Sequence, residues 1–335
     1  MQPRNRIQTA PPCNLSEGGD FCNWPPPRKR VGLAISSGGA KGLAHVGVIQ
    51  VLEENNILID AVAGASMGSY VGALWCAGYK GPQLFKLAAE IQTPQVMRRL
   101  ADVAFPPMKG LFHGKKAKRH LRRSIGDITF EKLHRSLYVV AADVDSNERV
   151  VFHHGRVIDA VHASCAMPGV IVPVKHQGRR CIDGGVVDPL PVSVLQSYAD
   201  VDITIAVTTI PTIEEIDHCE LVLPPNEKTS PLGYVANALS RRVNLLAKGN
   251  VIDTFNSALK SSQIRMARES CKRADIVIRP VSCIGRWYDY HEYKHFIEIG
   301  RQAAERALPQ IRKLLLPTIE SNETPASTMV GERFN

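Results

Sequence analysis

The stretch Asp60-Ala61-Val62-Ala63-Gly64-Ala65-Ser66-Met67-Gly68 carries the strongest structural signal in this chain of 335 residues. Its first four residues are short and apolar enough to form a buried strand. The residues that follow, Ser69-Tyr70-Val71-Gly72-Ala73-Leu74-Trp75-Cys76-Ala77, are typical of a buried helix that ends at Gly78. A strand that enters a helix through Gly-x-Ser-x-Gly makes a tight turn, which pushes the hydroxyl of Ser66 out of the backbone.

This nucleophile turn, residues 64–68, predicts a serine nucleophile for acyl transfer. Gly64 and Gly68 tolerate strained dihedrals, and a helix N-terminus favours the negative charge that develops beside such a serine. A second interpretation is a membrane-spanning helix, because residues 61–79 carry no charge and their glycines repeat at a spacing of four. The stretch has few large aliphatic residues, whereas a spanning helix needs about 20 predominantly apolar ones. The nucleophile turn is therefore favoured.

The composition is that of an ordinary globular protein, with 44% hydrophobic and 22% charged residues. The length allows one large domain or two modest ones. No apolar run follows the first residues, so we expect no secretory signal and a cytoplasmic location. The eight cysteines include no Cys-x-x-Cys pair, which predicts reduced thiols and no zinc site.

Short apolar runs alternate with helical patterns along the chain. Strands are expected near residues 31–35, 61–63, 137–142, 203–207 and 276–278. Helices are expected near residues 41–55, after Ser66, and at 81–91, 114–125, 157–166, 231–248, 251–269 and 291–315. Strands separated by helices imply parallel crossovers and a sheet that is covered on both faces. The predicted fold is a three-layer α/β/α architecture with a mostly parallel central sheet.

The two ends of the chain differ in composition from the rest. Residues 1–28 are rich in Pro, Gly, Asn and Ser, which predicts a flexible leader, and residues 317–335 form a polar tail. Between them we expect one α/β domain over residues 29–316. Its motifs lie within residues 31–210, and residues 211–316 form a helical part.

The formal net charge of +9 is not spread evenly. No acidic residue lies between Asp102 and Asp127, and this segment has the pattern of a basic helix with a narrow apolar stripe. We expect either a solvated helix face or a contact with an anionic membrane surface. Nucleic acid is not an expected partner, because the helix has no Phe, Tyr or Trp to stack on bases. The basic residues of this helix are Lys115, Lys116, Lys118, Arg119, Arg122 and Arg123.

A second motif, Ser36-Ser37-Gly38-Gly39-Ala40-Lys41-Gly42, follows the first expected strand. Glycines in this glycine loop allow backbone N–H groups to converge on an anion. The loop is not a P-loop, because no Ser or Thr follows a Gly-Lys pair, and it has no Gly-x-Gly-x-x-Gly register. We interpret it as an oxyanion hole beside Ser66; a tight turn without a ligand is the alternative.

A third motif, Asp183-Gly184-Gly185, supplies a candidate base. A serine hydroxyl needs a base within hydrogen-bonding reach, and partial burial beside Ser66 would raise the proton affinity of Asp183. The alternative is an ordinary turn, because Asp-Gly pairs are common in turns.

The three motifs occur in the order and setting of the patatin-like phospholipases, which this chain resembles over about residues 31–210. The run Ala163-Ser164-Cys165-Ala166-Met167-Pro168-Gly169 also looks like that family's stretch between nucleophile and base. The run Lys41-Gly42-Leu43-Ala44-His45-Val46-Gly47-Val48 resembles in particular the bacterial branch related to the catalytic domain of neuropathy target esterase.

The resemblance implies a Ser–Asp dyad hydrolase that acts on acyl esters of phospholipids, lysophospholipids or related lipids, without a metal or organic cofactor. Ser66 would attack the ester carbonyl while Asp183 takes its proton. The oxyanion would be held by a set of backbone amides with a lysine closing the loop, namely those around Gly38, Gly39, Ala40 and Lys41.

Several alternatives to this interpretation stay open. An acyltransferase would use the same nucleophile and amides, and a membrane-associated interaction protein would keep the fold without turnover. Ser37 stands where many members of the family carry a further glycine, so the loop amides that point inward are not fixed by the motif. The sequence predicts no oligomeric state.

The histidines offer a different catalytic set. A Ser-Asp-His triad would recruit a histidine downstream of Asp183, and the candidates are His218, His291 and His295. We expect His45, in the helix after the glycine loop, to be a packed residue rather than an acid–base group.

Overall fold

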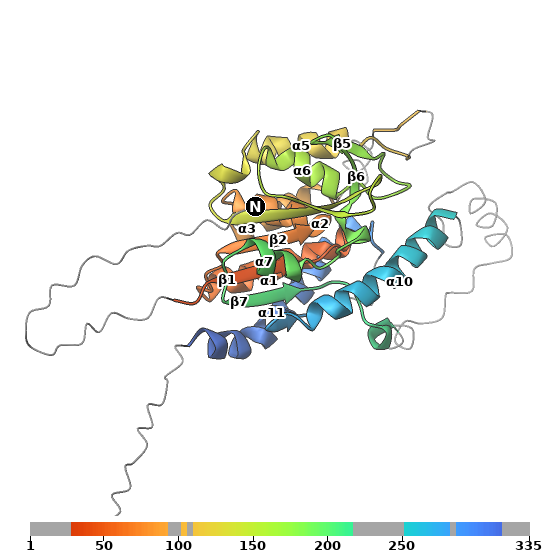
Figure 1. Cartoon of the computed structure of the whole chain (residues 1–335). Helices are drawn as coiled ribbons and strands as arrows, with labels where there is room; N and C mark the ends of the chain where they lie inside the picture. Colours follow the sequence, from red (N-terminus) through yellow and green to blue (C-terminus); the bar gives the residue numbers. More distant parts are fainter. Residues whose placement is uncertain (1–27, 93–101, 106–109, 217–250, 282–285, 317–335) are drawn as a thin grey trace, which may run out of the picture. The chain divides into compact units, whose positions relative to one another are not determined.

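The computed structural model of the chain describes residues 28–92, 102–105, 110–216, 251–281 and 286–316. These residues form one eight-stranded sheet with helices on both faces (Figure 1). The predicted three-layer α/β/α architecture is therefore confirmed. The expected leader and tail, the helix expected at 231–248 and His218 lie outside the described residues, apart from Arg28 of the leader.

The sheet has the strand order β5-β6-β3-β2-β1-β7-β8, and β4 also pairs with β3. The run from β3 to β8 is parallel throughout, whereas β4, β5 and β6 form antiparallel pairs. Every residue of the central strands β1, β2 and β7 is buried, which is why these strands are continuous apolar runs in the sequence. The strands are β1 (Val31–Ile35), β2 (Ala61–Ala65), β3 (Ser136–Asp143), β4 (Arg149–Phe152), β5 (Val174–His176), β6 (Arg179–Asp183), β7 (Ile203–Val207) and β8 (Ile276–Ile278).

Helices connect the parallel strands. The α-helices are α1 (Ala44–Glu54), α2 (Met67–Cys76), α3 (Gly81–Glu90), α5 (Lys115–Ile125), α6 (Val157–Ser164), α7 (Val192–Tyr198), α10 (Val251–Cys271) and α11 (Tyr293–Leu315). The short 3-10 helices are η1 (Gly39–Leu43), η2 (Phe130–Lys132), η3 (Gly184–Val186) and η4 (Tyr290–Glu292).

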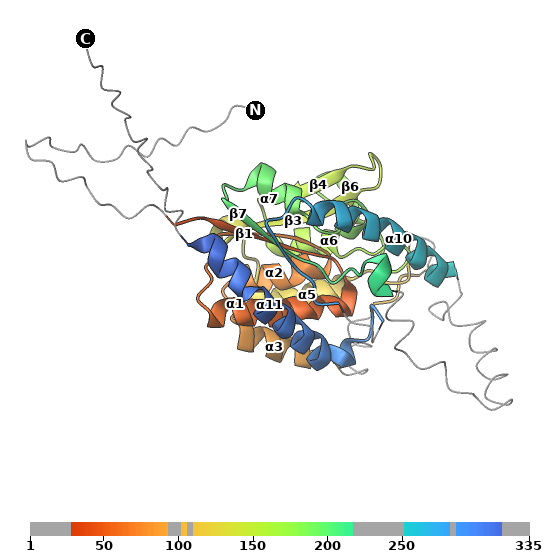
Figure 2. The same cartoon turned by 90° about the horizontal axis from the view of Figure 1, so that it is seen from below.

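The two faces of the sheet carry different helices. Figure 2 shows α7 and α10 on one face and α1, α2, α3, α5 and α11 on the other. The side chains of β1 alternate accordingly: Leu33 and Ile35 belong to the larger hydrophobic cluster, and Ala34 belongs to the cluster under α7.

The pairing register of β3 positions the candidate site. The last residue of β2, Ala65, pairs with Val140 of β3. The last residue of β6, Asp183, pairs with the next residue of β3, Ala141. The nucleophile turn and the Asp-Gly motif, which are more than a hundred residues apart in the sequence, therefore leave the sheet side by side.

The short elements β4, β5, β6 and α7 are not among the predicted strands and helices. The interpretation of residues 61–79 as a membrane span is wrong, because they form β2 and the ten-residue helix α2. Within the described ranges no helix combines the length and apolar character that crossing a membrane requires.

The cysteines in this part of the chain are free thiols, as predicted, and they are Cys76, Cys165, Cys181 and Cys271.

Candidate active site

Ser66 lies between the end of β2 and the start of α2, in a conformation that few non-glycine residues adopt. Its φ is 52° and its ψ is −122°. Hydrogen bonds hold this strained residue on both sides. Its amide donates to the Ser164 hydroxyl at 2.9 Å, and its carbonyl accepts from the Ser69 hydroxyl at 2.7 Å and the Tyr70 amide at 3.1 Å. The predicted nucleophile turn is thus present, and its strain is held by the surrounding structure.

The glycines of the nucleophile turn are there because neighbouring backbone lies too close for a side chain. A Cβ at Gly68 would lie 2.4 Å from the carbonyl oxygen of Ile35 and 2.6 Å from that of Ser36. A Cβ at Gly64 would lie 2.7 Å from the backbone of Gly68. Gly68 therefore lets the start of α2 pack directly on the end of β1, next to the glycine loop.

Ser164, at the end of α6, links Ser66 to the sheet. Its hydroxyl accepts the Ser66 amide and donates to the carbonyl of Val140 at 2.5 Å. Val140 is the residue that pairs with the end of β2. The local sequence predicts no role for Ser164, although this residue lies in the run of residues 163–169 that resembles the family.

Asp183 lies opposite Ser66 and accepts its hydrogen bond. The Ser66 Oγ donates to Asp183 Oδ2 at 2.6 Å, and the Gly185 amide donates to Asp183 Oδ1 at 2.8 Å. A Cβ at Gly184 would lie 2.1 Å from the carbonyl oxygen of Val140, so only glycine allows this segment to pack on β3. The fold therefore brings Ser66 and Asp183, the two residues predicted from the sequence, into hydrogen-bonding contact.

Burial controls the protonation of Asp183. Only 5% of the residue is exposed, and loss of water around the carboxylate raises its pKa to about 6. The hydrogen bonds from Ser66 and from the Gly185 amide act in the opposite direction, because they stabilise the charged form. The result is a carboxylate that is ionised at neutral pH and still has raised proton affinity.

The glycine loop faces this pair, and its amides divide into two groups. The Ser37 amide donates to Pro189 O at 2.9 Å, and the Ala40 amide donates to Trp287 O at 2.6 Å. The prediction that Ala40 donates to an oxyanion is therefore wrong, because this amide is already hydrogen-bonded. Within the described residues, no hydrogen bond engages the amides of Gly38 and Gly39, and both residues line the same cavity as Ser66.

The Trp287 carbonyl also shapes the loop at Gly39. A Cβ on Gly39 would lie 2.4 Å from that oxygen, and Gly39 has a φ of +56°. Glycine is required there on both counts. Trp287 is almost 250 residues away in the sequence, and nothing in the local pattern signals this contact.

A cavity of about 470 Å³ opens over Ser66 and Asp183. Polar groups and a set of apolar residues, called here the apolar wall, both line it. The apolar wall is made by Met167, Pro168, Val186, Ile210, Pro211, Leu259 and Trp287. Lys41 also lines the cavity, and burial together with the charge of Lys260 lowers its pKa to about 8, whereas Asp289 acts in the opposite direction.

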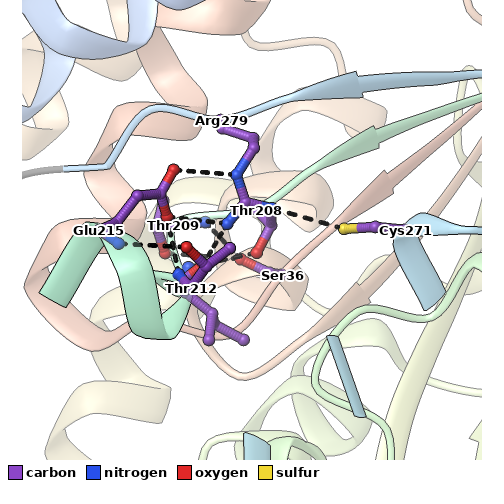
Figure 3. Close-up of polar contacts among 8 residues, drawn as sticks. Ser36, Thr208, Thr209, Thr212, Glu215, Cys271 and Arg279 are labelled. Atoms are coloured by element: carbon purple, nitrogen blue, oxygen red, sulfur yellow. Dashed lines mark hydrogen bonds and ion pairs between the residues drawn. The ribbon is translucent and has the colours of Figure 1, made fainter. Parts of the chain in front are cut away.

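A polar network fixes the loop after β7, which forms one wall of the cavity (Figure 3). The Thr209 amide donates to the Ser36 Oγ at 3.0 Å, and the Thr209 hydroxyl donates to the Ser37 carbonyl at 3.1 Å. Farther out, Arg279 donates to Glu215 at 2.9 Å and to the carbonyl of Ile210 at 3.4 Å. The ends of β1 and β7 are thereby tied together beside the glycine loop.

The histidines do not join the site in the described part of the chain. His45 is fully buried, its Nε2 lies 2.8 Å from the Ser36 carbonyl, and burial lowers its pKa to about 4. It is a packed, neutral residue, as predicted. His291 lies on the surface beside Glu292, and His295 packs on Phe296 in α11. None of the described histidines lines the cavity.

The predicted basic helix is α5, and part of its charge is neutralised. Lys118 forms an ion pair with Asp159, and Arg122 forms one with Asp127. Lys116 is half-buried. The exposed basic side chains of this helix that form no ion pair with another described residue are those of Lys115, Arg119 and Arg123.

Comparison with known proteins assigns one segment of the chain to a family. Residues 33–195 match the family model described as Patatin-like phospholipase. These residues form a patatin-like phospholipase domain. The matched segment contains the glycine loop, the nucleophile turn and the Asp-Gly motif. The patatin-like domain thus contains both Ser66 and Asp183, whereas α10, α11 and the Trp287 segment lie outside it.

Related proteins match this domain and, in one case, most of the chain. An uncharacterised NTE family protein of Mycobacterium tuberculosis is 38% identical over 53% of this chain and 49% of its own length. A second one is 29% identical over 84% of this chain and 46% of its own length. The lysophospholipase NTE1 of Candida glabrata is 32% identical over 48% of this chain and 9% of its own length. The chain therefore spans about half the length of the mycobacterial relatives and a small part of the yeast protein.

Solved structures with a similar arrangement include VipD from Legionella pneumophila and human GIVD cytosolic phospholipase A2. The first has a TM-score of 0.45 and 14% identity over 84% of this chain and 67% of its own. The second has a TM-score of 0.44 and 11% identity over 86% of this chain and 60% of its own.

Proposed function

We propose that this chain is a serine esterase that hydrolyses the acyl ester bond of lysophospholipids, phospholipids or related lipids through Ser66 and Asp183. The observation that carries the proposal is the 2.6 Å hydrogen bond from the Ser66 hydroxyl to a buried carboxylate in the lining of a partly apolar cavity. The family match and the name of the yeast lysophospholipase support the choice of a lipid ester as substrate.

In the first half of the reaction, Ser66 Oγ attacks the ester carbonyl carbon while its proton moves to Asp183 Oδ2. The tetrahedral oxyanion accepts hydrogen bonds from the amides of Gly38 and Gly39, and each such donor contributes about 3 kcal/mol to stabilising the transition state. The intermediate then breaks its bond to the alcohol oxygen, which takes the proton from Asp183. An acyl-enzyme on Ser66 and a free alcohol result.

In the second half, water replaces the alcohol. Asp183 accepts a proton from the water, whose oxygen attacks the acyl carbon. Collapse of this intermediate returns the proton to Ser66 Oγ and releases the fatty acid. The same groups act in both halves, so a single carboxylate serves as base and then as acid.

The protonation of Asp183 supports a dyad without histidine. A general base is most effective when its pKa is near the working pH, and burial raises the pKa of Asp183 to about 6. An exposed aspartate, with a pKa near 4, would be a much weaker acceptor. The Gly185 amide holds the other carboxylate oxygen, which keeps Oδ2 turned toward Ser66.

Release of fatty acid from lysophospholipid and of p-nitrophenol from an acyl ester tests the proposal. The wild-type protein should hydrolyse both, and Ser66→Ala should lower the rate by at least about a thousandfold. Adding glycerol or a lysolipid as acceptor separates hydrolysis from acyl transfer, because a hydrolase still yields mainly free fatty acid. Equal rates for wild type and Ser66→Ala would remove the proposal.

We also propose that the exposed face of α5 contacts an anionic membrane surface. Support comes from Asp102, whose carboxylate accepts hydrogen bonds from the amides of Gly114 and Lys115 at 2.8 Å. Val103 and Phe105 follow Asp102 closely in the sequence and are exposed, Phe105 to 92%. Basic side chains with a neighbouring exposed aromatic suit the interface of a bilayer.

A further inference from the structure

More cationic than anionic side chains line the cavity over Ser66. Three cationic side chains line it, those of Lys41, Lys260 and Arg286. Asp183 is the single carboxylate among the described residues that line it, and it is engaged by Ser66. The cations come from three separate segments, η1, α10 and the turn before η4. Only Lys41 belongs to the part of the chain that matches the family.

The side of helix α10 that carries Lys260 faces the cavity. Ser257, Lys260 and Gln263 recur every three residues, so they lie along one side of the helix, and all three line the cavity. The Gln263 Nε2 donates to the carbonyl of Gly185 at 3.0 Å. This hydrogen bond fixes that side of α10 against the residue whose amide holds Asp183. Lys260 is one helical turn away, about 4.5 Å along the axis.

Arg286 is held by a turn of its own. Its amide donates to Asp289 Oδ2 at 2.7 Å, and the Asp289 amide donates to the Arg286 carbonyl at 3.1 Å. The guanidinium donates to the Tyr288 hydroxyl at 2.5 Å. The next residue, Trp287, accepts the Ala40 amide through its carbonyl. The turn is therefore attached to the glycine loop, and Arg286 lines the cavity from that side.

Lys41 and Lys260 lie close enough to influence each other. The charge of Lys260 contributes to lowering the pKa of Lys41, after the larger contribution of burial. Asp289 offsets part of this effect. Two ammonium groups and a guanidinium around one cavity gain most from an anionic ligand that several of them can share.

We propose that Lys41, Lys260 and Arg286 form an anion subsite that binds the phosphate of the lipid head group, while the apolar wall receives the acyl chain. This inference rests on the proposed function. Substrates whose head group carries net negative charge, such as a phosphate monoester or a phosphoglycerol, are preferred over neutral and choline-bearing esters. A quaternary ammonium would face the same cations that hold the phosphate.

One aromatic residue of the cavity, Tyr288, agrees with this preference. A choline group is commonly bound over the face of an aromatic ring. The guanidinium of Arg286 already lies 5.8 Å from the centre of the Tyr288 ring and bonds to its hydroxyl. A second cation at that ring would meet the repulsion of Arg286, so the ring is better suited to positioning the arginine.

Steady-state kinetics on three esters with one acyl chain test the subsite. The esters are a monoacylglycerol, lysophosphatidylcholine and lysophosphatidylglycerol, each dispersed in the same neutral detergent. The wild-type kcat/KM should be highest for lysophosphatidylglycerol, by roughly tenfold, as expected when a charge-assisted contact is gained. Lys260→Gln and Arg286→Gln should each lower the ratio of lysophosphatidylglycerol to monoacylglycerol by about fivefold to tenfold, mainly through KM.

Arg265→Gln is the matched control, because Arg265 is an exposed cation on α10 that does not line the cavity. It should leave the substrate ratio within about twofold of wild type. Equal kcat/KM for the three esters, or the same loss with Arg265→Gln, would overturn the subsite. If no ester hydrolysis depends on Ser66, that result would instead contradict the proposed function.

Competition with soluble phosphates distinguishes a head-group site from a site for free phosphate. Glycerol 3-phosphate and inorganic phosphate are tested as inhibitors of p-nitrophenyl ester hydrolysis. The head-group assignment predicts competitive inhibition by glycerol 3-phosphate that weakens in Lys260→Gln and Arg286→Gln. Stronger inhibition by inorganic phosphate, without any preference among the three lipid esters, would contradict the head-group assignment and indicate a free-phosphate site.

Discussion

The Ser66 hydroxyl donates a 2.6 Å hydrogen bond to the Asp183 carboxylate because β3 receives both chain segments at neighbouring residues. Ala65 pairs with Val140, and Asp183 pairs with Ala141. The carbonyl of Val140 also accepts the hydroxyl of Ser164, which in turn accepts the Ser66 amide. One strand thus sets the position of the candidate nucleophile, of the candidate base and of the residue that supports the turn.

Asp183→Asn tests the base directly. An amide cannot take the proton from Ser66, and loss of a general base lowers kcat by roughly a hundredfold to ten-thousandfold. The unfolding temperature should not fall at pH 8, because the variant no longer buries a charged carboxylate. Ester hydrolysis and thermal unfolding are measured on the same samples.

Asp188→Asn is the matched control for that experiment. Asp188 is also a buried carboxylate of this loop, and it accepts a 2.6 Å hydrogen bond from Arg149 outside the cavity. Its replacement should lower the unfolding temperature and change kcat by less than about threefold. An Asp183→Asn variant that keeps wild-type kcat would show that another group takes the proton.

The pH dependence of kcat/KM follows from the raised pKa of Asp183. The carboxylate must be ionised to accept a proton, and its pKa is about 6. Activity on a neutral p-nitrophenyl ester should therefore be constant near pH 8 and fall about tenfold per unit below pH 6. A midpoint near pH 4, the ordinary value for an aspartate, would show that burial does not tune this group.

Ser164→Ala should weaken catalysis without removing the nucleophile. The Ser66 amide would lose its acceptor in a buried site, which costs about 1–3 kcal/mol. We expect a lower unfolding temperature and a lower kcat with little change in KM, because the strained turn is less well held. Ser164→Thr, which restores a hydroxyl, should recover part of kcat. Unchanged kcat in Ser164→Ala would mean that the turn holds its geometry without this contact.

Gly184→Ala should damage both stability and activity. The added Cβ would lie 2.1 Å from the Val140 carbonyl oxygen, so β3 or the segment after Asp183 has to move. We expect a loss of about 1–3 kcal/mol in unfolding free energy and a large fall in kcat. Gly178→Ala places its Cβ in open space at a φ of +78° and should affect stability alone. Equal activity losses for the two variants would contradict the packing argument.

Removing the exposed charges of α5 should weaken membrane contact. The triple variant Lys115→Gln/Arg119→Gln/Arg123→Gln should lose about 1 kcal/mol of membrane-binding free energy for each substituted residue. Flotation with phosphatidylglycerol vesicles should therefore fall more than tenfold, while hydrolysis of a soluble ester is retained. Lys132→Gln, an exposed lysine outside the helix, is the control. Binding that is equally strong to neutral vesicles would remove the electrostatic explanation.

The sequence predicts the parts of this molecule that depend on local pattern. The apolar runs of β1, β7 and β8 were placed correctly, because strands buried on both faces show continuous hydrophobicity. Strand β4 was missed because only its last residue is fully buried and it begins with the exposed Arg149, and α7 because it has seven residues and follows Pro191. Such short elements are stabilised by the sheet they pack on rather than by their own pattern.

In the candidate site, too, local sequence pattern predicts some residues and not others. Ser66 could be predicted from its turn, and Asp183 from an Asp-Gly pair in family order. The contact of Ala40 with Trp287 could not be predicted, because the two residues are 247 positions apart and neither carries a local signal. Lys260 and Arg286 reach the cavity through the packing of α10 and of the turn before η4, which only the three-dimensional structure reveals.

Covalent labelling of Ser66 measures the central claim most directly. The wild-type protein is treated with a long-chain alkyl fluorophosphonate, and the modified peptide is located by mass spectrometry. An activated serine should gain one phosphonyl group on the peptide that contains Ser66, with labelling abolished in Ser66→Ala and strongly slowed in Asp183→Asn. Absence of labelling, or stoichiometric labelling at a different residue, would contradict the assignment of Ser66 and Asp183 as a catalytic pair.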